Sequence, residues 1–67
     1  MPYVNFKLTP DGLTPENKAQ IIKETTDMLV RILNKNPATT MVTIETVETD
    51  NWGIGGETVT VLRQKKR

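Results

Sequence analysis

The chain has 67 residues and a net charge of +1, from 9 Lys and Arg against 8 Asp and Glu, and it contains neither Cys nor His. The balanced charge argues against a nucleic-acid binder, which would be strongly basic. The lack of Cys and His excludes disulfides and the common zinc sites. No apolar run is long enough to span a membrane, so we expect a cytoplasmic protein without membrane contact, forming one domain over residues 1–67.

A chain of this length is marginally stable alone, because it buries only about 60% of its unfolded surface. Small domains usually compensate with disulfides, a metal or oligomerisation. The acidic residues lack the spacing of a calcium loop, so we expect no metal. Oligomerisation is the remaining means of stabilisation, and we expect it here.

The opening Met1-Pro2 is the first candidate for chemistry. Once Met1 is removed, the Pro2 nitrogen is a free secondary amine, whereas Met1 in place makes it a tertiary amide that accepts no proton. Model α-amino groups titrate at about 7.7–8.0. Desolvation lowers that value towards the range in which a general base works best near neutral pH. Many chains begin Met-Pro without using the proline, so the dipeptide alone also fits no chemical role.

Residues 3–8 alternate, with Val4, Phe6 and Leu8 on one side, and predict a half-buried strand that holds Pro2 at its start. The turn residues 9–12 end this strand. A helix is predicted over residues 15–34, because apolar side chains recur at helical spacing between Ile21 and Leu33.

Both ends of the predicted helix carry capping signals. Thr14 suits the N-cap and Pro15 the first helical position. Asn17 stands where a capping box has Glu or Gln, so we expect an incomplete box. Asn34, followed by Pro37, ends the helix.

Residues 40–47 are rich in β-branched residues and predict a second strand. Strand, helix and strand form a βαβ unit, so the two strands should run parallel. One helix covers only one face of a sheet, and the other face would carry Tyr3, Met41 and Val47. Exposure of these side chains is a second argument for self-association.

After a polar turn at residues 48–51 comes Trp52-Gly53-Ile54-Gly55-Gly56. This segment is a poor phosphate site, because no Lys-Ser/Thr follows it and no helix is predicted to begin there. Residues 57–62 alternate again and predict a short strand, which with the glycine turn forms a hairpin-like arm able to reach a neighbouring subunit. The basic residues 63–67 are typical of a solvated, frayed end.

The segment Asn51-Trp52-Gly53-Ile54-Gly55-Gly56, at this distance from Met1-Pro2, resembles the 4-oxalocrotonate tautomerase family. The similarity covers nearly the whole chain in length and order of elements. It implies βαβ subunits assembled as a homohexamer, a trimer of dimers, that acts without a cofactor. It also implies that the initiator Met is lost and that Pro2 moves a proton between an enol and a carbon next to a carbonyl. Trp52 matches the aromatic residue that lines the family's apolar pocket.

The chain departs from the family at two arginine positions. The glycine before the helix is followed here by Leu13, and the arginine position early in the second strand matches Met41. Neither side chain provides the cationic fork that binds a carboxylate or polarises a carbonyl. Lys7 and Arg63 are the candidate replacements in substrate binding, with solvent-facing positions as the alternative.

Two functions follow from these residues. The first is a tautomerase for a small 2-oxo or enol acid of the 2-hydroxymuconate or phenylenolpyruvate type, with Pro2 as general acid and base and Trp52 as the apolar wall. The alternative is a catalytically weakened oligomer of the same fold that binds such acids, which Leu13 and Met41 favour. A small RNA-binding domain is a distant third, because no aromatic-basic strand motif is present.

Overall fold

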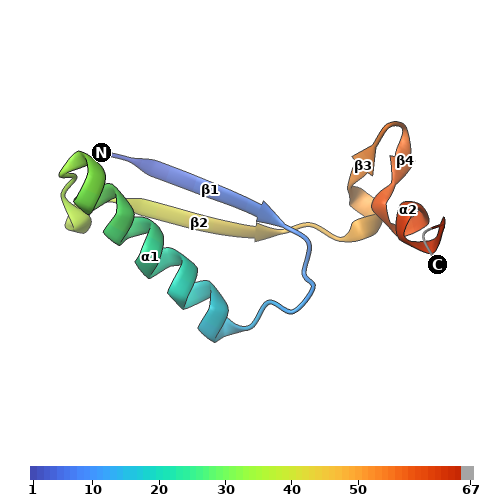
Figure 1. Ribbon diagram of the computed structural model, residues 1–67, viewed down its shortest axis with the longest axis horizontal. Helices are drawn as coiled ribbons and strands as arrows, with labels where there is room; N and C mark the ends of the chain where they lie inside the picture. The colour runs from blue at the N-terminus through green and yellow to red at the C-terminus, as the bar shows by residue number, and fades with distance from the viewer. Residues whose placement is uncertain (66–67) are drawn as a thin grey trace.

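The computed structural model describes residues 1–65. It has a β-α-β unit at one end and, at the other, an arm formed by residues 53–65 (Figure 1). Strand β1 (Tyr3–Leu8) pairs in parallel with β2 (Met41–Thr46), from Tyr3 opposite Met41 to Leu8 opposite Thr46. Helix α1 (Pro15–Leu33) connects them and runs back across the sheet. The predicted α/β fold, with its βαβ unit and parallel strands, is confirmed, although the helix ends at Leu33 and not at residue 34, and the second strand covers Met41–Thr46 and not residues 40–47.

Helix α1 begins and ends as its capping residues dictate. The Thr14 hydroxyl oxygen accepts a hydrogen bond from the Asn17 backbone N–H at 3.0 Å, and Asn17 Oδ1 accepts one from the Thr14 N–H at 3.3 Å. The capping box is therefore complete, and the expectation that Asn17 would leave it incomplete is wrong, because an Asn amide oxygen reaches the N-cap as Glu or Gln does. Asn34 ends the helix in the left-handed conformation, with φ of 54°.

The sheet is covered on one face only. Thr25 of α1 is buried, at 8% exposure, and the apolar side chains of β1 and β2 that share the helix side are half-buried. No hydrophobic residue within residues 1–65 is fully buried. The β-α-β unit thus has packed elements without a closed core.

The arm starts with a hairpin of β3 (Gly53–Ile54) and β4 (Glu57–Thr58), which pair antiparallel. Gly55 and Gly56 make the turn between them, both with positive φ, which glycine adopts without steric cost. The expected hairpin is therefore confirmed, and the Trp52 carbonyl anchors it by accepting the Val59 N–H at 2.7 Å.

The segment after the hairpin is helical, and the predicted strand over residues 57–62 is wrong beyond Thr58. Helix α2 (Val59–Lys65) replaces it. A longer β4 would need a partner, but β3 has only two residues and the chain before it turns through the 3₁₀ segment Thr49–Asn51. Backbone groups without a strand partner are satisfied within a helix. The Thr58 hydroxyl also accepts the Val61 N–H at 3.2 Å in the first turn.

The basic end is more ordered than expected. Arg63 and Lys65 lie in α2, so the frayed end is wrong for these positions; residues 66 and 67 lie outside the described part of the chain. Lys65 pairs with Glu57 at 2.7 Å, and Arg63 pairs with Asp11 at 2.9 Å. No helix within residues 1–65 is long and apolar enough to cross a membrane.

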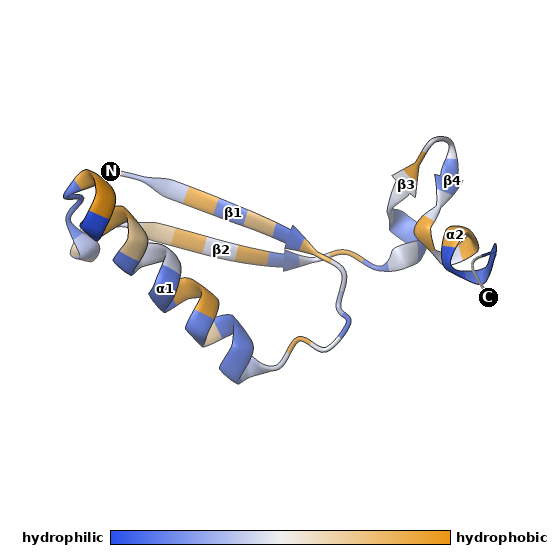
Figure 2. Ribbon diagram, viewed as in Figure 1, coloured by the Kyte–Doolittle hydropathy of each residue, from blue (hydrophilic) through white to orange (hydrophobic). Residues whose placement is uncertain are grey.

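The chain is extended for its length. Its radius of gyration is 15.5 Å and its extents are 44 × 24 × 16 Å, whereas a compact 67-residue chain has a radius of gyration of about 11 Å. Hydrophobic residues remain exposed along the later turns of α1 and on the arm (Figure 2). They include Met28, Ile32, Leu33, Ile54 and Val61.

Candidate active site

Pro2 lies at the end of the sheet where the parallel strands β1 and β2 begin. Its carbonyl oxygen accepts a hydrogen bond from the Met41 N–H at 3.0 Å, and β1 begins with the next residue. Pro2 is half-buried, and the Met41 side chain beside it is 45% exposed. The structure therefore brings together two of the residues predicted for the site.

Trp52 and Lys7 meet at the opposite end of the sheet. Together with Val47, Asn51 and Gly53 they line a cavity of about 230 Å³. Trp52 is half-buried and directly follows the 3₁₀ turn, while Lys7 is the penultimate residue of β1. The cavity combines one cationic side chain with an indole wall.

Within one chain, Pro2 and the cavity lined by Trp52 and Lys7 lie at opposite ends of the sheet. Pro2 precedes β1, whereas Lys7 lies near its end, and the five residue steps between them, at about 3.3 Å each, place them roughly 17 Å apart. Trp52 lies further on, beyond the end of β2 (Figure 1). A pocket containing both Pro2 and Trp52 thus requires more than one copy of the chain.

Leu13 lies in a third place. It lines a cavity of about 480 Å³ along the first turns of α1, with Asn17, Gln20, Ile21, Glu24 and Thr25. This cavity has no cationic side chain in its lining and is far from Pro2, because α1 begins near the end of β1 (Figure 1). Leu13 therefore brings no charge to a carboxylate.

Arg63 and Lys7 are both held in ion pairs. The Arg63 guanidinium donates to both carboxylate oxygens of Asp11, each at 2.9 Å. This bidentate bond, with a second from Thr9, holds the pKa of Asp11 well below its usual range. Lys7 Nζ donates to Glu45 Oε1 at 3.0 Å and lowers the pKa of Glu45, with help from Asn5. Neither cation is a free fork for substrate within this chain.

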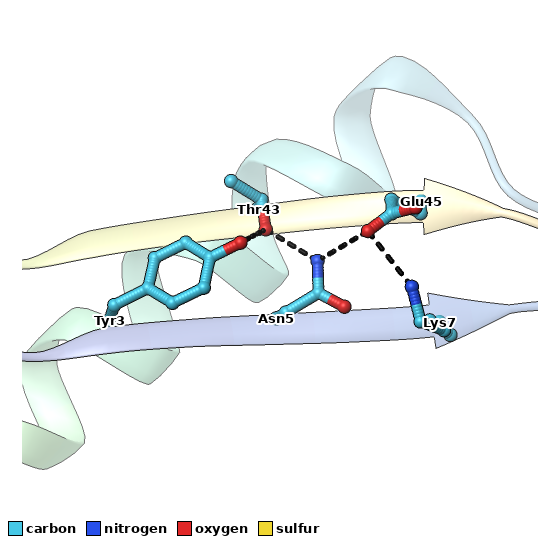
Figure 3. A network of polar contacts seen from close by, with 5 residues as sticks. All are labelled: Tyr3, Asn5, Lys7, Thr43 and Glu45. Atoms are coloured by element: carbon cyan, nitrogen blue, oxygen red, sulfur yellow. Dashed lines mark hydrogen bonds and ion pairs between the residues drawn. The ribbon is translucent and has the colours of Figure 1, made fainter.

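The open face of the sheet carries a continuous polar network (Figure 3). The Tyr3 hydroxyl is 2.9 Å from the Thr43 hydroxyl, which accepts a hydrogen bond from Asn5 Nδ2 at 2.6 Å. Asn5 Nδ2 also donates to Glu45 Oε1 at 3.0 Å, where Lys7 donates in turn. Polar contacts thus run along this face, which also leaves Tyr3 and Met41 exposed, as the alternation of the two strands predicted.

From the sequence, Tyr3 was placed on the uncovered face of the sheet, but no role was assigned to it or to Asn5, Thr43 and Glu45. The signal was present, because period-2 alternation puts odd-numbered residues of both strands on one face. A parallel register, with Tyr3 opposite Met41, then places each pair side by side. Within residues 1–65 no group of three His, Cys, Asp or Glu side chains is placed to hold a metal ion.

Comparison with known proteins identifies the family. The family model described as "Tautomerase enzyme" matches residues 2–62. The chain belongs to the tautomerase family. It is 60% identical over 65 residues to "Probable tautomerase K2" of Dickeya dadantii (strain 3937), covering 97% of each chain.

Solved structures similar to this chain share its fold. DmpI from Helicobacter pylori is 44% identical, with a TM-score of 0.84 over 90% of this chain and 98% of its own. A structure of the 4-oxalocrotonate tautomerase isozymes from Methylibium petroleiphilum is 30% identical, with a TM-score of 0.80 over 91% of this chain and 97% of its own. The tautomerase family is thus the one that the sequence resemblance had indicated.

Proposed function

We propose that this tautomerase interconverts the enol and keto forms of a small 2-oxo acid, without a cofactor, using Pro2 as general acid and base. The Pro2 nitrogen takes the proton from the enol oxygen or from the carbon next to the carbonyl. It returns that proton to the other end of the conjugated system, so the enzyme is unchanged. The observation that carries this proposal is the position of Pro2 at the start of β1, where its carbonyl oxygen accepts a hydrogen bond from the Met41 N–H.

The proposal requires loss of Met1, which frees the Pro2 nitrogen. Met1 is 82% exposed, so the fold of this chain does not shield the Met1–Pro2 bond. At the sheet edge, half-buried, the free amine would be partly desolvated, which lowers an amine pKa towards neutrality. A base of that kind works at physiological pH.

The proposed pocket is shared between copies in a homohexamer. Trp52 of a second chain supplies the apolar wall beside Pro2, because each chain holds its own Trp52 at the far end of the sheet. The lack of any fully buried hydrophobic residue in residues 1–65 supports assembly as the means of stabilisation.

The second candidate function is binding without useful catalysis. It is favoured by the ion pairs of Lys7 with Glu45 and Arg63 with Asp11, together with Leu13 and Met41 at the family's arginine positions. A site without a strong electrophilic donor loses on the order of a hundredfold or more in rate. Such a protein would bind a small acid and release it unchanged.

The test is the ketonisation of phenylenolpyruvate, followed by absorbance, with protein whose intact mass shows that Met1 is gone. We expect acceleration by the wild type and a loss of about a hundredfold or more in kcat/KM for a form with one extra residue before Pro2, because that form has an amide in place of the base. Pro2→Ala retains a primary amine, and we expect it to lose most of the activity. Because the ammonium form is inactive, activity should fall as pH drops through the amine pKa.

Equal rates for the wild type and the blocked form would contradict the role of Pro2. A wild type that does not accelerate ketonisation, yet binds phenylpyruvate in calorimetry, would favour the second candidate function.

A further inference from the structure

Tyr3 lies at the Pro2 end of the open sheet face. It is the direct cross-strand neighbour of Met41, the position at which the family resemblance leads us to expect an arginine. Neighbouring strands in a sheet lie about 5 Å apart. Tyr3 is 59% exposed, and its hydroxyl lies beside the Thr43 hydroxyl on this face (Figure 3).

The direction of the hydrogen bonds follows from the other end of the network. Glu45 accepts from Lys7, and a carboxylate only accepts. Asn5 therefore turns its amide nitrogen towards Glu45, since the flipped amide would set oxygen against oxygen. The same nitrogen is 2.6 Å from the Thr43 hydroxyl, and an amide nitrogen only donates, so Thr43 accepts there.

The Thr43 hydroxyl proton is then free to point at Tyr3. The two hydroxyl oxygens are 2.9 Å apart, and either could donate. With Thr43 already accepting from Asn5, donation from Thr43 to Tyr3 continues the chain in one direction. Hydrogen bonds that follow one another in this way polarise and strengthen each other. Tyr3 is then the last hydroxyl of the chain, and its proton can be donated to a further acceptor.

We propose that the Tyr3 hydroxyl donates a hydrogen bond to a carboxylate or enolate oxygen of the substrate, in place of the missing arginine. This inference rests on the proposed function and names a group that stabilises the negative charge on that substrate oxygen. The hydroxyl points along β2 to Thr43, two residues or about 7 Å beyond Met41, which suits a conjugated acid stretched from Pro2 across the open face. A tyrosine hydroxyl carries one proton that it can donate in a hydrogen bond. The substrate class is a flat conjugated monocarboxylate, because a single neutral donor suits one carboxylate.

The experiment compares Tyr3→Phe with the wild type, using protein shown by mass to lack Met1. We expect kcat/KM for phenylenolpyruvate to fall about tenfold or more, as for loss of a hydrogen bond to a charged group. Thr43→Val removes the hydroxyl that orients Tyr3 and should have a smaller effect in the same direction, whereas Thr43→Ser should restore the rate. Thr46→Val is the matched control, because Thr46 lies on the same strand but on the helix side of the sheet.

Binding gives a second readout that does not depend on turnover. Calorimetry with cinnamate, a flat acid that cannot tautomerise, should show Tyr3→Phe binding about tenfold more weakly than the wild type. Equal cinnamate affinity for the two proteins, or no binding to either, would overturn the role of Tyr3. Inactivity of the wild type with weaker binding to Tyr3→Phe would contradict the tautomerase activity and still support the donor.

Discussion

At the scale of single residues, Asp11 and Arg63 join parts of the chain that lie 52 positions apart. Asp11 is in the turn after β1, whereas Arg63 is in α2, so their bidentate pair ties the arm to the β-α-β unit. Both side chains are about half exposed, and we therefore expect the pair to fix the direction of the arm more than to stabilise the fold.

This pair gives a prediction about titration. The pKa of Asp11 is lowered chiefly by the Arg63 hydrogen bond, so Arg63→Gln should raise it towards the ordinary value of about 3.9. A carboxyl whose folded pKa is depressed contributes stability above its unfolded pKa and loses it as pH falls through the folded pKa. The tie should thus persist at acidic pH where an ordinary Asp is already protonated. Carboxyl NMR titration measures this directly.

Arg31→Gln is the control for that titration, because it also removes one arginine but lies in the last turn of α1. An Asp11 pKa that is equally low in Arg63→Gln and in the wild type would show that the ion pair does not form in solution.

At the scale of elements, the N-terminus of α1 shows how much a capping residue contributes to the stability of the fold. The Thr14 hydroxyl satisfies the Asn17 N–H, and Ala cannot do so. We expect Thr14→Ala to lower the free energy of unfolding by about 1 kcal/mol per chain, while Thr14→Ser retains most of the stability. Urea unfolding at one fixed protein concentration measures the difference. Equal midpoints for Thr14→Ala and Thr14→Ser would contradict a role for the cap.

The β-α-β unit could be predicted from the sequence because its signals are local. Alternation in residues 3–8 and the caps at Thr14 and Asn34 define β1 and α1 without knowledge of distant contacts. Helix α2 could not be predicted in this way, because the alternation of Val59, Val61 and Leu62 fits either a strand or one helical turn. The helix forms because β3 offers no pairing partner beyond Thr58, and this depends on the tertiary structure.

The residues of the candidate site could be predicted from the sequence, but their positions relative to one another could not. Pro2 and Trp52 were singled out from their sequence setting, but their separation depends on the parallel strands and on where the arm leaves the sheet. The Tyr3 network was missed because it needs the register between β1 and β2, which no single strand reveals.

At the scale of the whole molecule, exposed apolar surface predicts that folding and assembly are coupled. Ile32, Leu33 and Ile54 are 61%, 56% and 59% exposed, on α1 and on the arm (Figure 2). Full burial of such a side chain contributes about 1.5–3 kcal/mol relative to full exposure, so covering these partly exposed side chains in an interface supplies a share of the stability that a chain without a closed core needs. An assembly that stabilises only the folded chain makes the melting temperature depend on concentration.

We therefore expect the melting temperature to rise over about a hundredfold range of protein concentration, as mass action requires. Ile54→Asp, at the tip of the arm, should lower it and shift the sedimentation profile to smaller species. Gln64→Asp is the matched control, because it adds the same charge to the arm at an exposed residue without removing apolar surface. A melting temperature independent of concentration, together with a monomer mass, would mean that the extended chain is stable alone. The pocket shared between Pro2 and Trp52 would then not exist.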